Sequence, residues 1–182
     1  MTKPIIAALD ERLEGEKVIL RPFQEADITA IYLTWLNDPK VVRFSNQRFL
    51  RHSEESGRQY LSSFIDSDNH FLAICDRESG AMIGTITVYL NKHHRTADIG
   101  IMVGNTSSWG KGFGLDAFQT VSSALEQSGF VRKLTAGTLA ANEGMIRVMK
   151  KAGFEWEATR KEHELIDGQP VDVLYYSKFF HA

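Results

Sequence analysis

A cluster of glycines in the middle of the chain is the clearest place for chemistry in this sequence. Gly110, Gly112 and Gly114 alternate within SSWGKGFGLDAFQTV, residues 107–121, which follows a predicted strand and opens a predicted helix. The first N–H groups of a helix lack partners within the helix, and the helix dipole favours negative charge there. Glycine lets a ligand approach the backbone closely. The stretch therefore predicts a phosphate-binding loop, the alternative being a tight turn that needs glycine for its geometry alone.

Two common nucleotide-binding motifs do not fit this loop. A Walker loop needs G-x-x-x-x-G-K-[ST], but five residues separate Gly104 from Gly110, and Gly112 follows Lys111 where Ser or Thr is required. A Rossmann fingerprint needs G-x-G-x-x-G, and Leu115 occupies the place of its third glycine. The phosphate must therefore belong to a ligand that a different loop recognises.

The elements around the loop predict a single α/β domain over residues 1–182, with a mixed central sheet flanked by helices. Runs of β-branched and aromatic residues predict strands at 18–22, 70–75, 82–90, 97–104 and 133–139, and a hairpin around Asp167-Gly168. Apolar residues at helical spacing predict helices near 28–36, 54–65, 115–129 and 142–153. Asp27 and Asn142 are the predicted N-caps of the first and last helix. The helix between 97–104 and 133–139 should leave these two strands parallel.

The glycine loop resembles the pyrophosphate loop of the GNAT superfamily of acetyltransferases, [R/Q]-x-x-G-x-[G/A]. The run WGKGFG matches it with Trp109 in the Arg/Gln place, and WGKG is similar to the RimJ/RimL branch. Three further stretches resemble this branch in the same order: VILRPFQEADITAIYLTWLNDPKV, RTADIGIMVG and ANEGMIRVMKKAGFEWEATRKEHELIDGQPVDVLYYSKF. The chain is therefore identified as a member of this branch. The resemblance implies the GNAT fold, in which two neighbouring strands splay apart.

The resemblance also implies a co-substrate, acetyl-CoA, and no metal. Its pantetheine arm is expected in the gap between the splayed strands, where it would bind the backbone of Ile101, Met102 and Val103. Asn142 occupies the place of a family asparagine that contacts the arm. The pyrophosphate is expected at the loop residues Trp109, Gly110, Lys111, Gly112, Phe113 and Gly114. Lys111 either neutralises phosphate charge or is merely solvated.

The proton acceptor of the reaction has several candidates. The acceptor amine must lose a proton before it attacks the thioester. Asp98 matches an acidic residue of the branch, with a structural carboxylate as the alternative, and His94 in the preceding loop could relay a proton or be idle. Tyr175 and Tyr176 lie on opposite faces of the last strand, and Tyr176 is predicted to be the catalytic one. The predicted catalytic set is therefore Asp98, Tyr176 and His94.

The proton donor is harder to find than the proton acceptor. An N–H group of the strand near Met102 could stabilise the oxyanion. The two places where relatives carry a general acid hold Met145 and Met149, neither of which can donate a proton. The acid is therefore elsewhere, is water, or is not needed. Loss of both acids also leaves open an alternative function, a non-catalytic acyl-CoA-binding regulator with the same fold.

The acceptor is implied to be a primary amine, on an amino sugar or at a protein N-terminus. WLNDPKVVRFS and RHSEESGRQYLSSF resemble a subgroup that acts on nucleotide-linked amino sugars. Trp35, Arg43 and Arg51 in these stretches are the predicted substrate-binding residues. The arginines would suit the phosphates of such a substrate, or they belong to a solvated loop.

Composition limits the other partners. The 182 residues carry a net charge of -2, which gives no global basic field for nucleic acid. The acidic N-terminus does not resemble a signal peptide, and no apolar run is long enough to span a membrane, so a cytoplasmic location is expected. The single cysteine, Cys75, has neither a disulfide partner nor metal-ligand neighbours. A homodimer stays open, because dimers are common in the branch.

Overall fold

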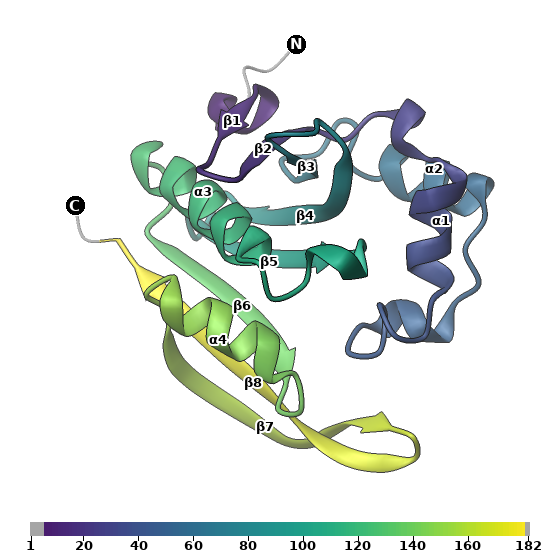
Figure 1. The fold of residues 1–182 in the computed structure, drawn as a ribbon. Helices are drawn as coiled ribbons and strands as arrows, with labels where there is room; N and C mark the ends of the chain where they lie inside the picture. Colours follow the sequence, from purple (N-terminus) through teal and green to yellow (C-terminus); the bar gives the residue numbers. More distant parts are fainter. Residues whose placement is uncertain (1–5, 181–182) are drawn as a thin grey trace.

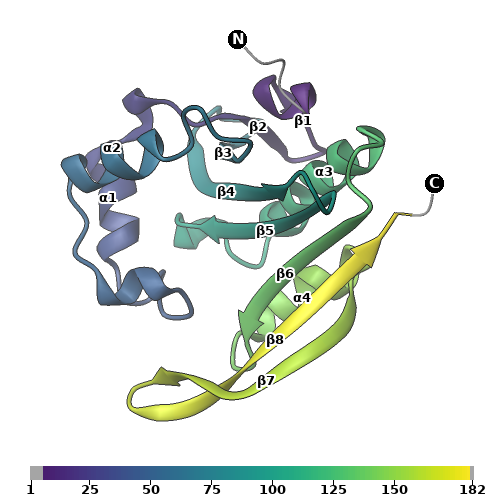
Figure 2. The same cartoon turned by 180° about the vertical axis from the view of Figure 1, so that it is seen from behind.

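The computed structural model describes residues 6–180, whose strands form one eight-stranded mixed sheet in the order β1-β2-β3-β4-β5-β6-β8-β7 (Figures 1 and 2). The strands are β1 (Leu13–Glu14), β2 (Val18–Pro22), β3 (His70–Asp76), β4 (Met82–Asn91), β5 (Thr96–Val103), β6 (Lys133–Leu139), β7 (Glu155–Ile166) and β8 (Gln169–Phe179). The helices are α1 (Ala30–Asn37), α2 (Glu54–Ser62), α3 (Phe113–Gln127) and α4 (Glu143–Lys151). No helix in the described part is long and apolar enough to cross a membrane.

Side-chain alternation along the strands divides the core into two layers. On β3, Leu72 and Ile74 belong to the larger cluster, which packs under α3 and α4. Phe71, Ala73 and Cys75 belong to the smaller cluster, which packs under α1 and α2. The sheet is therefore covered on both faces. Alternate residues of a strand pack against different helix pairs, one against α3 and α4 and the next against α1 and α2.

The central feature of the sheet is the place where β5 and β6 part. These two strands are the one parallel pair of the sheet, and they pair through only three positions, which end at Asp98 and Thr135. Beyond that point β5 continues beside β4 alone, and β6 continues beside β8. Figure 1 shows β6, β8 and β7 swinging away from β5. The predicted parallel crossover is confirmed. Because the pairing of β5 with β6 ends after three positions, the two strands leave a gap between them.

The first helix begins later than predicted. Thr29 is its N-cap, and the Thr29 side chain accepts the N–H of Tyr32 at 3.2 Å. Asp27 lies instead in a short 3-10 turn, where its carboxylate binds both terminal nitrogens of Arg21 at 2.7 and 2.8 Å. The prediction of Asp27 as N-cap is wrong because Arg21, at the end of β2, holds this carboxylate.

The C-terminal hairpin turns where predicted but is longer than the sequence pattern indicated. Asp167 and Gly168 form the turn with φ of 50° and 77°, which suits a two-residue hairpin. The register shifts between Arg160 and Glu164, so β7 bulges before it reaches the turn. Figure 2 shows the tip of β7 and β8 extending past the sheet, toward the segment between α1 and α2. The hairpin tip and this segment line the two sides of one groove.

Candidate active site

The glycine loop gives α3 an open N-terminus. Gly110 and Gly112 have φ of 73° and 88°, a left-handed conformation that favours glycine. Gly112 is the N-cap of α3, and no side chain among the described residues caps this helix. A side chain added at Gly110 would meet nothing within 4 Å. The first N–H groups of α3 are therefore available to an anion, as the sequence predicted from the spacing alone.

A residue far away in the sequence adds charge to this loop. The ammonium of Lys17 donates to the carbonyl of Lys111 at 2.9 Å. Asp116, in the first turn of α3, fixes the backbone of that segment by accepting the N–H groups of Glu16, Lys17 and Val18 at 2.8 to 3.1 Å. Lys111 itself is exposed. The sequence analysis missed Lys17, because only the fold brings the start of β2 beside the loop.

Trp109 holds the loop against the end of β5. Its indole Nε1 donates to the carbonyl of Val103 at 2.7 Å. Its ring remains 40% exposed, with the ammonium of Lys40 5.6 Å from the ring centroid. Phe113 packs against the larger core cluster, and Gly114 lies close to Val103, since an added Cβ would be 3.4 Å from its Cγ2. Trp109 and Phe113 thus anchor the loop through their side chains, and the glycines leave its backbone N–H groups accessible to a ligand.

The backbone of β5 faces the gap at alternate residues only. The N–H of Gly104 donates to Ile83 on β4. In an antiparallel strand successive residues direct their polar groups to opposite edges, so Met102 also faces β4, and Ile101 and Val103 face the gap. This corrects the expectation for Met102: its backbone groups are directed to β4, and its side chain packs with the smaller core cluster.

On the far side of the gap, Asn142 caps α4. Its Oδ1 accepts the N–H of Met145 at 3.2 Å, and its Nδ2 donates to Thr138 Oγ1 at 3.0 Å. Met149 is fully buried, and Met145 packs against the same core. The predicted cap is confirmed, and the inner face of α4 offers no proton donor at these two positions.

The gap opens into a hollow of about 230 Å³ on the α1 and α2 side of the sheet. Residues of β5, β6 and both strands of the hairpin line it. Its lining includes Phe44, Asn46, Asp98, Thr138, Glu164 and Tyr175. Two acidic residues and a tyrosine therefore line the hollow where β5 and β6 part.

Asp98 lies at the last paired position of β5. Its Oδ2 accepts the hydroxyl of Thr135 on β6 at 2.6 Å. The carboxyl remains open to solvent, but the walls of the hollow surround it and remove part of its hydration. This desolvation raises the pKa of Asp98 above the usual 3.8, although the hydrogen bond from Thr135 acts in the opposite direction. Asp98 is thus a stronger base than an ordinary surface aspartate.

The other two predicted catalytic residues lie away from the hollow. Tyr176 is 4% exposed and belongs to the larger core cluster, so no substrate can reach it. Its neighbour Tyr175 lines the hollow, with its ring lying across Gly137. His94 is exposed in the turn before β5, at the opposite end of the strand from the gap. Tyr175 therefore replaces Tyr176 as the tyrosine of the site, and the fold gives His94 no part in it.

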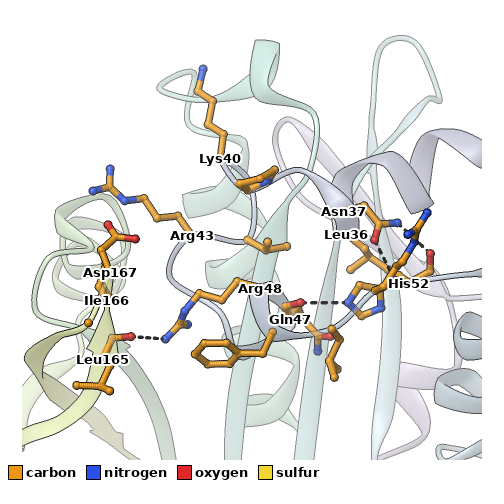
Figure 3. Close-up of a pocket in the computed structure, with 16 residues that line it drawn as sticks. Leu36, Asn37, Lys40, Arg43, Gln47, Arg48, His52, Leu165, Ile166 and Asp167 are labelled. Atoms are coloured by element: carbon orange, nitrogen blue, oxygen red, sulfur yellow. Dashed lines mark hydrogen bonds between the residues drawn. The ribbon is translucent and has the colours of Figure 1, made fainter.

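The predicted substrate residues divide in the same way. Trp35 is 9% exposed and packs against Gly104, where an added Cβ would overlap its ring. Arg43 and Arg51 line a wide groove of about 1230 Å³ between the α1–α2 segment and the hairpin tip (Figure 3). Trp35 is thus a core residue beneath the end of β5, and the two arginines belong to an open site.

Comparison with known proteins identifies the fold and the reaction. The profile of the acetyltransferase (GNAT) domain matches residues 17–155. The chain belongs to the GNAT acetyltransferase family. It is 25% identical over 169 residues to the uncharacterized N-acetyltransferase YoaA of Bacillus subtilis, an alignment that covers 91% of this chain and 94% of YoaA. The protein is therefore an acetyl-CoA-dependent N-acetyltransferase.

Solved structures of this family share the fold at low sequence identity. RimL, described as a ribosomal L7/L12 alpha-N-protein acetyltransferase in complex with coenzyme A, is similar with a TM-score of 0.82 at 18% identity, covering 93% of this chain and 98% of that one. The spermidine N-acetyltransferase of Vibrio cholerae, in complex with CoA and spermine, has a TM-score of 0.81 at 17% identity, covering 91% and 97%. The predicted GNAT fold is confirmed.

The features of this GNAT enzyme fit coenzyme A. The uncapped N-terminus of α3, opened by two left-handed glycines, suits a pyrophosphate. Beyond Asp98, the edge of β5 that faces β6 has no partner strand among the described residues. This edge runs from the glycine loop to Asp98, and it suits an extended arm with hydrogen-bonding groups. The described residues contain no group of three or more side chains suited to hold a metal ion.

Proposed function

We propose that this enzyme acetylates a primary amine, on an amino sugar or at a protein N-terminus, in the hollow beside Asp98. The observation that carries the proposal is the position of this hollow: it opens where β5 and β6 part, so it adjoins the gap that suits the cofactor arm. The fold serves both protein and small-amine acceptors, as the descriptions of RimL and the spermidine enzyme indicate.

The cofactor contacts come from three elements. The first N–H groups of α3, with Lys17 beside them, bind the pyrophosphate. The backbone groups of Ile101 and the N–H of Val103, which face the gap, bind the pantetheine arm, whereas the Val103 carbonyl accepts the Trp109 indole. Asn142, held by Thr138, faces the arm from the other side. Acetyl-CoA supplies an acetyl group activated as a thioester, and these contacts place it at the hollow.

Asp98 accepts the proton of the amine. An alkylammonium must lose one proton before its nitrogen can attack, and the Asp98 carboxylate is the base at the end of the gap. Its raised pKa strengthens it as a base, and the Thr135 hydroxyl fixes its orientation. Glu164 also lines the hollow, but its carboxylate lies 3.5 Å from Arg48, so the negative charge that attracts the cationic amine comes mainly from Asp98.

Protonation of the departing sulfur has one candidate in the hollow. The phenol of Tyr175 lies there, whereas Met145 and Met149 of α4 carry no proton. Tyr175 delivers its proton to the sulfur and regains one from solvent. A thiol of pKa about 8.5 also leaves as a thiolate at moderate cost, so loss of the phenol should slow turnover without abolishing it.

Calorimetric titration with acetyl-CoA, with ATP as the control, tests the cofactor assignment first. Saturable binding of acetyl-CoA and not of ATP is expected. Release of free CoA is then followed across amino sugars, peptides with a free N-terminus and polyamines. The mechanism would be supported if the rate of acetylation rises with pH in proportion to the deprotonated fraction of Asp98. Failure to bind acetyl-CoA, or turnover unchanged in Asp98→Asn, would refute it.

A further inference from the structure

The wide groove next to the hollow is strongly basic. Its lining carries four cationic side chains, Lys40, Arg43, Arg48 and Arg51, against one carboxylate, that of Asp167. The whole chain has a net charge of -2, so this positive charge is a local concentration rather than a general property of the surface. A field of this kind in a concave site attracts anions and repels cations.

The groove and the hollow adjoin each other at the hairpin. Arg48 reaches across to the hairpin, where it donates to the carbonyl of Leu165 at 3.0 Å and lies 3.5 Å from the carboxylate of Glu164 (Figure 3). Glu164 lines the hollow, whereas Arg48 and Leu165 line the groove. A ligand whose amine lies beside Asp98 therefore extends past this ion pair into the groove.

Three of the four cations are available to such a ligand. Arg48 is committed to the hairpin and is only 14% exposed. Lys40, Arg43 and Arg51 take part in no ion pair with the residues that the structure describes. Figure 3 shows Arg43 extending toward the hairpin tip that carries Asp167. Guanidinium groups bind phosphate with paired, charge-assisted hydrogen bonds, which makes Arg43 and Arg51 the main recognition groups.

The groove also offers apolar surface at its rim. Phe49, Leu50 and Leu165 line it and are 70%, 62% and 54% exposed. Large exposed side chains beside arginines suit a ligand that has both a charged part and a flat apolar part. The volume of about 1230 Å³ would hold a nucleotide, whereas the hollow of about 230 Å³ holds only the amine and its nearest atoms.

We propose that the acceptor amine of this enzyme carries a phosphate or diphosphate group, which binds Arg43 and Arg51 in the groove. The inference rests on the proposed function and narrows it. The site has opposite charges at its two ends: Asp98 faces the amine, and Arg43 and Arg51 face the anion, with the paired Arg48 and Glu164 between them. A nucleoside diphosphate linked to an amino sugar has this arrangement of charge. Spermidine, a polycation, would meet repulsion along the whole groove.

Binding of UDP to the enzyme saturated with CoA tests the inference without turnover. CoA saturation excludes UDP from the cofactor loop, and uridine is the matched ligand without phosphate. Wild-type enzyme should bind UDP and not uridine, as measured by titration calorimetry. The double variant Arg43→Gln/Arg51→Gln should raise the Kd for UDP about tenfold or more. Arg58→Gln, on the outer surface of α2, removes one positive charge outside the groove and should leave the Kd unchanged.

A variant in the opposite direction separates recognition from folding. Asp167→Asn removes the one carboxylate that lines the groove, so UDP should bind about two- to fivefold more tightly. A general loss of structure cannot produce tighter binding. Acetyl transfer to glucosamine 1-phosphate should show a lower KM than transfer to glucosamine, and the double variant should abolish this difference.

Several results would overturn the inference. CoA binding without UDP binding would refute it while leaving the proposed function intact. Wild-type affinity for UDP in the double variant would also refute the inference and leave the proposed function intact. Efficient acetylation of spermidine would have the same meaning. Acetylation of an acidic peptide N-terminus by an enzyme that does not bind UDP would assign the groove to a protein acceptor. If acetyl-CoA itself does not bind, both the function and this inference fail.

Discussion

Replacement of Gly112 by alanine tests whether the left-handed backbone at the start of α3 serves cofactor binding. Gly112 has φ of 88°, and an alanine in this conformation costs about 1–2 kcal/mol. The added Cβ would lie 3.7 Å from the Lys17 ammonium, an ordinary contact, so no clash adds to this strain. We therefore expect Gly112→Ala to fold, with its free energy of unfolding lowered by about this amount.

The effect on cofactor affinity should be larger than the effect on stability. Alanine relieves its strain by rotating the peptides on either side, which turns the first N–H groups of α3 away from the pyrophosphate. Loss of one charge-assisted hydrogen bond corresponds to about 1.5–3 kcal/mol. The Kd for acetyl-CoA should therefore rise about ten- to a hundredfold in Gly112→Ala.

Gly80 supplies a matched control in the turn between β3 and β4. It has φ of 74°, and an added Cβ there meets nothing within 4 Å. Gly80→Ala should lower the free energy of unfolding by a similar amount, measured by chemical denaturation, and leave the calorimetric Kd for acetyl-CoA unchanged. Wild-type affinity in Gly112→Ala would refute the role of the loop. Equal loss of affinity in both variants would show that backbone strain anywhere in the fold is sufficient to weaken acetyl-CoA binding.

Three further substitutions test the site and the fold. Asp98→Asn should lower kcat about 10²- to 10⁴-fold and remove the acidic limb of the pH–rate profile; a limb that persists would exclude Asp98 as the base. Thr135→Val removes the hydrogen bond that lowers the pKa of Asp98, so that limb should move to higher pH. Asp27→Asn should lower the free energy of unfolding at neutral pH by about 2 kcal/mol, a value reduced for the partial exposure of the pair with Arg21. Burial raises the pKa of Asp27, but the hydrogen bonds from Arg21 and the Gln24 N–H outweigh it and hold the pKa below 3.8. This stability is present above the pKa of the unfolded chain and is lost as pH falls through the folded pKa, so denaturation of wild type and Asp27→Asn should converge in acid.

Features with a local signal were predictable from the sequence. The strand over 133–139 and the N-cap Asn142 both appear where the pattern placed them. The Asp167-Gly168 turn and the left-handed glycines of the loop also depend on the backbone preferences of single residues. Such preferences act over a few positions, so the sequence carries them explicitly.

Features that depend on register or on distant contacts were not predictable. Alternation showed that Tyr175 and Tyr176 face opposite sides of β8, but only the pairing of β8 with β6 decides which side holds the hollow. The apolar pattern of the first helix could not show whether Trp35 is a core residue or a substrate-binding residue; the fold buries it in the core. Lys17 reaches the glycine loop because Asp116, 99 positions later, accepts its backbone N–H.

The placement of the proton-transfer groups has a consequence for catalysis. The family resemblance led us to expect the acid on the helix that is α4, but Met149 on this helix is fully buried in the core. Asp98, Glu164 and Tyr175 all reach the hollow from strands, on the face of the sheet opposite α3 and α4. The groups proposed to accept and donate protons therefore lie on the face of the sheet that α1 and α2 cover. Displacement of water by a bound acceptor would raise the pKa of Asp98, but the positive charge of an alkylammonium beside the carboxyl would lower it. Under the mechanism proposed above, the charge of the bound amine therefore helps to keep Asp98 in the carboxylate form that accepts its proton.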